Sequence, residues 1–427
     1  MIGTYGTALR PYVHKRLEQM READILVGIP CFNNEGTVAH VIRTVSEGLF
    51  EHFPQARSAL VVADGGSTDD TRDVAMTLET RPWQEKLVTI YRGVAGKGTA
   101  LRAIFEAADR LHVKACACVD SDLRSISTDW VKHLLDPVLE GDYEFVAPVY
   151  ARYKYDGTIT NNIVYNLTRS LYGKRIRQPI GGDFAFSRGL ARHYLEQDVW
   201  GTDIARFGID VWMTTNAVVS GAKICQANLG VKVHDAKDPA EALGPMFRQV
   251  CGTLFQLMED NEALWSPIRG SEAVPTFGPE VVQEPQPIAV NQPRMVREFQ
   301  EGYRHFGPVW HAMFSGEVSQ VLESLRGAAA EEFAIPVEVW VKLLYELAAK
   351  YHRMPDHRMK MLSVMTPLYL GRIASFISQT RDMTSFDAEA VAEEQAAVFE
   401  EQKSYLINVW ARGEAPADLA EALSEKA

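Results

Sequence analysis

The sequence predicts an α/β protein with a mostly parallel sheet flanked by helices, followed by a helical C-terminal region. In the first part of the chain, short apolar runs alternate with segments that carry apolar residues at helical spacing. Acidic and glycine-rich stretches follow several of these runs, which is typical of the turns that leave the carboxyl ends of parallel strands. Further on, a proline-rich break gives way to helical periodicity alone.

Five apolar runs predict strands: Ile25–Ile29, Ala59–Ala63, Leu87–Tyr91, Ala115–Val119 and Phe145–Val149. Three segments between them predict crossover helices: Thr37–Phe50, Asp70–Leu78 and Gly98–Leu111. Because helices connect the strands, we expect the ligand to bind at the carboxyl edge of the sheet.

A chain of 427 residues with 46% hydrophobic content is large enough for two domains. We expect a catalytic domain over residues 1–260, a proline-rich linker or long loop over 261–294, and a helical domain over 295–427. The acidic C-terminal helices carry apolar stripes, so we expect them to serve packing or assembly into a homodimer or larger oligomer.

The net charge of -12 argues against nonspecific binding to nucleic acid or to an anionic membrane. The five cysteines are scattered and form no pattern of a zinc cluster or a disulfide framework. Charged residues interrupt the N-terminal segment, and we find no signal peptide pattern and no long uncharged apolar run. We therefore expect a cytoplasmic protein.

The acidic pair Asp120 and Asp122 closes the fourth apolar run in the sequence Val119-Asp-Ser-Asp122. Carboxylates at a strand end offer hard oxygen ligands to Mg²⁺ or Mn²⁺, which clamps a diphosphate and makes it a better leaving group. Aspartate pairs also cap ordinary turns, but the position directly after an apolar strand favours the metal interpretation.

Three other strand ends carry residues suited to a nucleotide ligand. Gly28–Glu35 follows the first strand, with Pro30 ending that strand and Asn34 and Glu35 placed to contact a base or to cap a helix.

Asp64 ends the second strand before two glycines, where it can accept hydrogen bonds from a base or ribose or can hold a turn. Lys97 lies in Gly96-Lys-Gly-Thr99, where a helix N-terminus and an ammonium group could attract a phosphate. Neither a Walker A loop nor a dinucleotide-binding fingerprint is present.

The order of these motifs resembles that of the GT-A glycosyltransferases, a nucleotide-sugar-dependent fold, over about residues 24–240. Four later segments resemble the retaining mannosylglycerate and glucosylglycerate synthases and their glucosyl-3-phosphoglycerate relatives. These segments are Arg152–Thr160, Gln178–Asp183, Phe207–Asp210 and Val233-His234.

The resemblance implies a glycerate site formed by Arg152, Asp156 and Thr160, with Gly157 in the same loop. An arginine suits this role because it can bind a carboxylate by two parallel hydrogen bonds. Ile180, in the turn Pro179–Gly182, would help to orient the attacking hydroxyl through its carbonyl; glycines there also fit a simple tight turn.

By the same resemblance, Asp122 and His234 would ligate the divalent ion and Asp120 would contact the ribose or the sugar. Asp210 would lie near the anomeric carbon, either orienting the substrates or acting as a nucleophile. Taken alone, His234 reads as an ordinary strand-end histidine.

Two positions depart from the family pattern. Asn34 stands where a glutamate usually follows the first asparagine, and Glu35 comes one place later. Thr158 stands where we expect a basic residue in the phosphoglycerate-using relatives, so a phosphate would lose a charge-assisted partner. This difference favours D-glycerate over 3-phosphoglycerate.

The sequence therefore predicts a metal-dependent, retaining transfer of glucose or mannose from a nucleoside diphosphate to D-glycerate, which yields a compatible solute. The alternatives are a glucosyl-3-phosphoglycerate synthase, an inverting GT-A transferase with another acceptor, a nucleotidyltransferase, and a non-catalytic sugar-nucleotide sensor. A nucleotidyltransferase would carry a glycine-rich basic loop after the first strand, which Pro30–Glu35 lacks.

Overall fold

The computed structural model describes residues 6–234, 244–280, 283–412 and 417–426. The chain folds into two compact units, which we describe separately. The sheet unit comprises Met1–Ala151, Ile176–Asp235 and Ala273–Gln283, and the helical unit comprises Arg152–Arg175, Ala236–Glu272 and Glu284–Ala427.

The sheet unit is built on eight strands in the order β10-β8-β5-β7-β4-β1-β2-β3. Every neighbouring pair is parallel except those made by β7, which runs antiparallel to both β4 and β5. The strands are β1 (Ile25–Cys31), β2 (Ser58–Asp64), β3 (Glu85–Ile90), β4 (Ala115–Cys118), β5 (Phe145–Ala151), β7 (Phe184–Ser187), β8 (Ile224–Val231) and β10 (Thr276–Phe277). A separate two-stranded sheet pairs β6 (Lys174–Arg175) with β9 (Glu272–Ala273).

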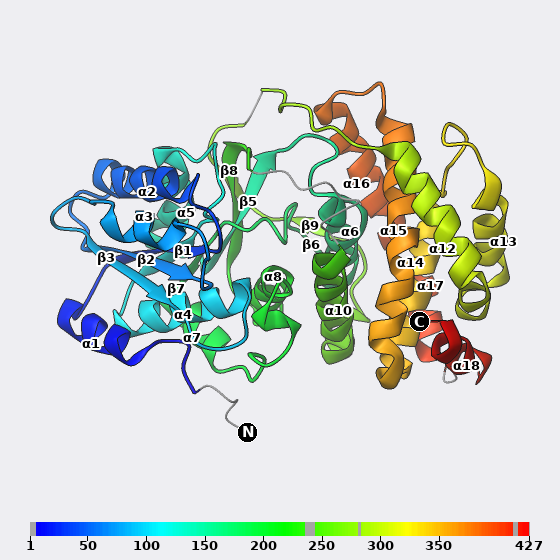
Figure 1. Cartoon of the computed structure of the whole chain (residues 1–427), viewed down its shortest axis with the longest axis horizontal. Coiled ribbons are helices and arrows are strands. Elements are labelled where there is room, and N and C mark those ends of the chain that lie inside the picture. The colour runs from blue at the N-terminus through cyan, green and yellow to red at the C-terminus, as the bar shows by residue number, and fades with distance from the viewer. Residues whose placement is uncertain (1–5, 235–243, 281–282, 413–416, 427) are drawn as a thin grey trace. The chain divides into compact units, whose positions relative to one another are not determined.

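Helices cover both faces of the eight-stranded sheet (Figure 1). The apolar faces of α2, α3 and α5 pack on one side, where side chains of β1, β2 and β4 complete a continuous core. On the other side α4 packs against β1 and β2 and contacts α7. The helices of this unit are α1 (Pro11–Met20), α2 (Val38–His52), α3 (Thr71–Thr77), α4 (Lys97–Arg110), α5 (Thr128–Glu140), α7 (Arg188–Leu195), the 3₁₀ turn η2 (Asp203–Ala205) and α8 (Ile209–Val219).

The helical unit packs around α14 and α15, whose tryptophan, tyrosine and leucine side chains are almost fully buried. Close approach of α12 and α15 depends on Gly302, since a Cβ at that position would lie 2.4 Å from Cβ of Pro367. The elements are η1 (Thr160–Val164, a π-helix), α6 (Tyr165–Tyr172), α10 (Gly244–Asp260), α11 (Glu262–Trp265), α12 (Gln292–Met313), α13 (Gly316–Ser324), η3 (Leu325–Gly327), α14 (Val337–Arg353), η4 (Pro355–His357), α15 (Arg358–Thr380), α16 (Ser385–Glu401), α17 (Lys403–Ala411) and α18 (Ala417–Lys426).

The predicted fold class is confirmed: a mostly parallel sheet flanked by helices precedes a helical C-terminal region. All five predicted strands form within two residues of their predicted bounds, as do the three crossover helices. β7, β8 and β10 are not among the predicted strands. β7 and β10 are only four and two residues long, too short for a clear periodicity.

The predicted linear division of the chain at residues 260 and 294 is corrected by the structure. Residues 152–175 and 244–272 belong with the C-terminal helices, because α6 packs on α16 and α10 packs on α15. Part of the proline-rich stretch instead extends the large sheet, since Thr276 and Phe277 pair in parallel with β8. Contacts between segments far apart in the sequence decide these boundaries.

One helical stretch among the described residues, Pro355–Thr380, is long and apolar enough to cross a membrane by length and composition. In the structure 78% of its most apolar window is buried. The core helix of a globular unit passes the same test, so this is weak evidence for a membrane span.

Gly98, the second residue of α4, allows this helix to begin against the backbone of η2. A Cβ on Gly98 would lie 1.9 Å from the Ile204 carbonyl oxygen. We therefore predict that Gly98→Ala lowers the free energy of unfolding by about 1–3 kcal/mol, although alanine normally favours a helix. Urea unfolding followed by circular dichroism measures this change.

Gly189→Ala is the matched control, because Gly189 is the second residue of α7 and a Cβ there meets only Ser187 Oγ at 3.6 Å. The control variant should be as stable as the parent protein or slightly more stable. Equal stability of both variants would show that α4 can shift away from η2 without cost.

Candidate functional site

The loops that follow β1 and β4 meet at the carboxyl edge of the large sheet. The Ser121 hydroxyl donates to Asn34 Oδ1 at 2.8 Å, and the Thr37 hydroxyl donates to the Ser121 carbonyl at 2.8 Å. Asn34 therefore ties the β1 loop to the loop that carries Asp120 and Asp122. This contact fits the expectation that polar strand ends gather at one edge.

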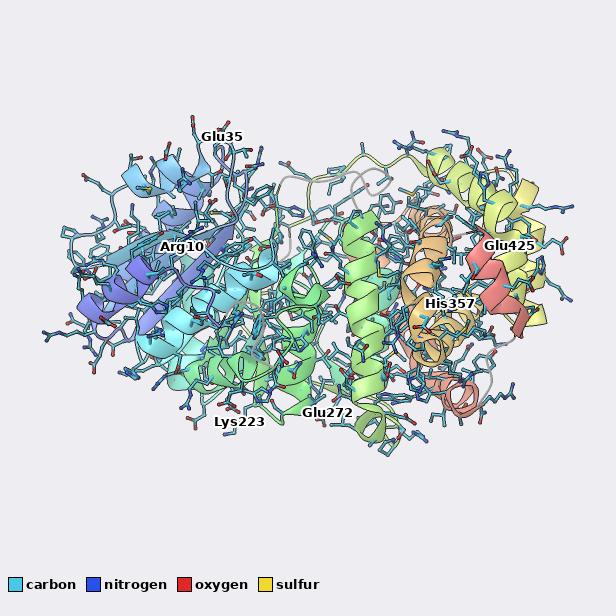
Figure 2. The ribbon with its side chains drawn as sticks, turned by 60° about the horizontal axis from the view of Figure 1, so that its bottom comes forward. Arg10, Glu35, Lys223, Glu272, His357 and Glu425 are labelled. Carbon is cyan, nitrogen blue, oxygen red and sulfur yellow. The ribbon has the colours of Figure 1, made fainter. Side chains whose placement is uncertain are left out.

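Pro30 and Glu35 differ in their surroundings. Pro30 is buried inside β1, which continues to Cys31, so the expectation that Pro30 ends the strand is corrected by one residue. Glu35 is exposed at the periphery of the sheet unit (Figure 2), and its Oε2 accepts a hydrogen bond from the Asp70 amide at 3.0 Å. The β1 and β2 loops thus support each other through Glu35.

Asp64 holds the turn after β2. Its side chain is fully buried, and its carboxylate accepts hydrogen bonds from the amides of Gly66 and Ser67 at 3.0 and 3.1 Å and from the Ser67 hydroxyl at 2.5 Å. In the structure Asp64 therefore stabilises the turn, which is one of the two roles that the sequence allows. Contact with a base or ribose stays a prediction.

Lys97 lies between two carboxylates from distant parts of the sheet unit. Its Nζ is 2.8 Å from Asp120 Oδ1 and 3.2 Å from Asp210 Oδ2. The three side chains are only 12–23% exposed. Lys97 begins α4, Asp120 follows β4, and Asp210 lies in the first turn of α8. The fold thus unites three residues that the sequence analysis selected separately.

Asp183 and Lys232 extend this cluster. Lys232 Nζ lies 2.9 Å from Asp183 Oδ2 and 3.4 Å from Asp120 Oδ2, and donates to the Gly181 carbonyl at 2.8 Å. Asp183, which is fully buried, also accepts the Asp120 amide at 2.8 Å and the Tyr150 hydroxyl. Neither Asp183 nor Lys232 is among the predicted site residues. In the sequence, the signal for a role of Lys232 was its position two residues before His234.

Burial and neighbouring charges act against each other in this cluster. Burial favours neutral groups, yet the Asp120 and Asp210 carboxylates hold the pKa of Lys97 above its usual value, and Lys97 and then Lys232 hold the pKa of Asp120 below its usual range. Burial raises the pKa of Asp210 although Lys97 opposes this shift. Oδ1 of Asp210 is buried and makes no hydrogen bond within the described residues. Its hydrogen-bonding capacity is therefore unused within the described residues.

Asp122 and His234 belong to two neighbouring backbone segments. Leu123 and His234 form an antiparallel bridge, and the Arg124 amide donates to the Val233 carbonyl at 2.9 Å. Burial, followed by the nearby Asp120 carboxylate, raises the pKa of Asp122, while neighbouring Lys232 and His234 act in the opposite direction. The structure therefore brings together the two residues that the sequence resemblance pairs as metal ligands.

No group of three His, Cys, Asp or Glu side chains within the described ranges is arranged to hold a metal ion by itself. Mg²⁺ commonly keeps several waters and takes only one or two carboxylates from the protein, with the remaining ligands from substrate phosphates. Asp122 and His234, next to a second carboxylate, provide a donor set that fits this mode of binding.

The N-terminus of α4 does not present a free row of amides. The Gly98 amide donates to the Arg206 carbonyl at 3.1 Å, and the Gly96 amide donates to the Tyr91 hydroxyl at 3.0 Å. The expectation that this helix end attracts a phosphate is corrected for these two amides. Within this motif, the ammonium group of Lys97 faces the carboxylates of Asp120 and Asp210.

Ile180 lies in a turn closed by the Gly181 amide, which donates to the Gln178 carbonyl at 3.1 Å. The next residue, Gly182, has φ +93°, and a Cβ there would lie 2.2 Å from Asp120 Oδ2. Glycine is therefore required for Asp120 to approach this turn. The turn and the acidic cluster form one structure within the sheet unit.

Arg152, Asp156, Gly157 and Thr160 belong to the helical unit, so we describe them within it. Arg152 Nε donates to Asp156 Oδ2 at 2.8 Å, and a Cβ on Gly157 would lie 3.2 Å from Arg152 Nη1. Thr160 is buried and begins the π-helix η1. Arg152, Asp156 and Gly157 are thus in contact, as a shared binding role requires.

Thr158 makes an internal contact of the helical unit. It is 2% exposed, and its hydroxyl lies 2.6 Å from the Tyr369 hydroxyl in the core of the helical unit. The identity of residue 158 is therefore no basis for choosing between glycerate and phosphoglycerate, which corrects the expectation from the sequence. Two other cations that could receive a phosphate are engaged elsewhere: Lys154 binds backbone carbonyls, and Arg169 is paired with Glu393 and Glu400.

Comparisons with known proteins find similar sequences and structures among glycosyltransferases. Residues 26–198 match the model of Glycosyl transferase family 2. "Glycosyltransferase AglJ" from Haloferax volcanii is 27% identical over 200 residues, which are 45% of this chain and 58% of that protein. The chain thus spans less than two thirds of the length of that relative.

Solved structures of glucosyl-3-phosphoglycerate synthase from Mycobacterium tuberculosis are also similar. The complex with Mg²⁺ and uridine diphosphate is 25% identical with a TM-score of 0.44, covering 57% of this chain and 82% of the other. The complex with phosphoglyceric acid is 26% identical with a TM-score of 0.45, covering 59% and 86%. The predicted resemblance to glycosyltransferases is confirmed by the match of residues 26–198 to the model of Glycosyl transferase family 2.

Proposed function

We propose that this protein is a metal-dependent, retaining hexosyltransferase that moves glucose or mannose from a nucleoside diphosphate to the 2-hydroxyl of D-glycerate. The observation that carries the proposal is the convergence of Lys97, Asp120 and Asp210 beside Asp122 and His234 in a family 2 domain. The acceptor class comes from the resemblance of residues 152–160 to the glycerate-using synthases.

In this proposal Asp122 and His234 hold a divalent ion, which would neutralise charge on the departing diphosphate. Lys97 contributes a second positive charge whose position is fixed before the donor binds, because Asp120 and Asp210 already hold its ammonium group. A preorganised charge stabilises a transition state without the cost of reorienting water. Asp120 contacts the ribose or the sugar.

Asp210 has one carboxylate oxygen paired with Lys97 and the other without a protein partner. In the proposal, the unpaired Oδ1 orients the acceptor and the sugar near the anomeric carbon or attacks that carbon. Ile180, on the glycine turn that touches Asp120, orients the attacking hydroxyl through its carbonyl. The leaving phosphate then accepts the proton of that hydroxyl.

The charge of the proposed acceptor site favours a small monoanionic acid. Arg152 is partly neutralised by Asp156, while the ammonium group of Lys154 and the guanidinium of Arg169 serve internal contacts. A glycerate carboxylate needs one arginine, whereas a phosphate dianion needs more positive charge. This supports D-glycerate, and 3-phosphoglycerate remains the alternative acceptor.

A product assay tests the proposal. Purified protein with Mg²⁺ or Mn²⁺ would be offered glucose donors with uridine, guanosine or adenosine diphosphate, and GDP-mannose, against D-glycerate and 3-phosphoglycerate. We expect an α-linked glycerate glycoside, identified by NMR. Preference for the phosphorylated acid would establish the alternative synthase, a β-linked product would establish inversion, and no glycoside of either acid would refute the proposed acceptor.

Asp122→Asn should weaken activation by Mn²⁺ at least about tenfold, because an amide replaces a charged metal ligand of the same size. Titration of transferase activity with Mn²⁺ measures the change. Asp129→Asn is the control, since Asp129 is exposed and pairs with His52. Unchanged Mn²⁺ dependence of Asp122→Asn would remove this residue from the metal site.

Asp210→Asn should lower kcat by about 10²- to 10³-fold while the KM of the nucleotide sugar changes little, because the lost charge acts on the transition state. Steady-state kinetics with a saturating acceptor gives both values. Asp203→Asn serves as a control, since Asp203 is a carboxylate in η2 that pairs with Arg206. A turnover rate like that of the parent protein would exclude Asp210 from the chemistry.

A further inference from the structure

Arg152–Thr160, which we call the acceptor segment, is fastened to α15 and α16 of the helical unit through Lys154. This lysine is 8% exposed. Its Nζ donates to the carbonyls of Thr380 and Met383 at 2.6 Å and of Arg381 at 3.0 Å. An ammonium group has three N–H donors, and these three carbonyls satisfy them all.

The position of these carbonyls explains why a lysine is buried there. Thr380 is the last residue of α15, and the final carbonyls of a helix lack partners within the helix and carry its negative dipole end. A cation from another segment can donate hydrogen bonds to these carbonyls, and the negative end of the helix dipole stabilises its charge. Lys154 therefore caps the C-terminal end of α15. The same hydrogen bonds fix the position of the backbone at residue 154.

Four more hydrogen bonds fasten the acceptor segment and the next residue to the same two helices. The Lys154 amide donates to Ser385 Oγ at 3.3 Å, and the Tyr155 hydroxyl donates to the Ile377 carbonyl at 3.4 Å. Thr158 and Tyr369 hydroxyls lie 2.6 Å apart, and Gln395 Nε2 donates to the Asn161 carbonyl at 2.7 Å. Contacts thus occur at Lys154, Tyr155, Thr158 and Asn161.

We infer that Lys154 is a positioning residue for the acceptor, and that α15 and α16 form the support on which the acceptor site is built. Arg152 and Asp156, which bind each other at 2.8 Å, lie two residues on either side of Lys154. A shift of Lys154 therefore moves both. The inference rests on the proposed function, and it gives the C-terminal helices a role in recognising a small carboxylate.

Lys154→Met tests this inference, because methionine retains an unbranched apolar chain and removes the ammonium group. We expect the KM for D-glycerate to rise about 10- to 100-fold, as misplacement of a binding group does. The KM of the nucleotide sugar and the metal-dependent hydrolysis of the donor without acceptor should stay within about twofold. Hydrogen–deuterium exchange should increase in residues 152–161 and not in β1, β2 and β4.

Lys342→Met is the matched control, since Lys342 lies in the same unit and pairs with Glu317. Its acceptor KM should equal that of the parent protein. Ser385→Ala, which removes one hydrogen bond to the Lys154 amide, should raise the acceptor KM by a smaller factor. This second variant decides the question if Lys154→Met does not fold.

The outcomes separate the two proposals. If the parent protein transfers sugar to neither D-glycerate nor 3-phosphoglycerate, the proposed function is refuted and the inference falls with it. If the parent protein transfers sugar but both variants keep its acceptor KM, the function stands and the positioning role is refuted. Equal losses for donor and acceptor would also refute it, because they indicate general damage to the structure.

Discussion

The ion pair between Lys97 and Asp120 is the interaction on which the rest of the sheet unit's polar edge depends. It joins the start of α4 to the end of β4, and Asp210 and Lys232 add partners on either side. Removing one partner of a buried pair typically costs about 3–5 kcal/mol, because the other charge stays buried and uncompensated. The cluster therefore holds its loops in place before any ligand arrives.

Glycine makes this arrangement sterically feasible. Gly98 lets α4 start against η2, and Gly182 lets the turn around Ile180 reach the Asp120 carboxylate. In both places a Cβ would overlap an oxygen atom. Backbone contacts thus set the positions of Lys97 and Asp120, and the charges then stabilise what the backbone permits. Such preorganisation would serve the proposed release of a diphosphate.

In the helical unit, a buried lysine likewise holds a segment in place. Lys154 satisfies the end of α15 and in doing so holds the residues that flank it, Arg152 and Asp156. Thr158 is a residue of this segment for which the sequence suggested a wrong role. A threonine in a polar loop suggests a side chain that faces a ligand. In the structure its hydroxyl contacts that of Tyr369 in the core. Some 200 residues separate these partners, so no local pattern reveals the contact.

By itself the sequence determined the alternating strands and helices and the sheet edge that carries the polar residues. It also determined the motifs around Asp64, Lys97 and Asp120. These features are predictable because hydrophobic periodicity and turn chemistry are local properties. Only the tertiary structure decided that Lys232 and Asp183 complete the acidic cluster, and that residues 152–175 belong to the helical unit. The reason is physical: burial, ion pairing and packing between distant segments depend on how the chain folds back on itself, and no spacing in the sequence encodes these distances.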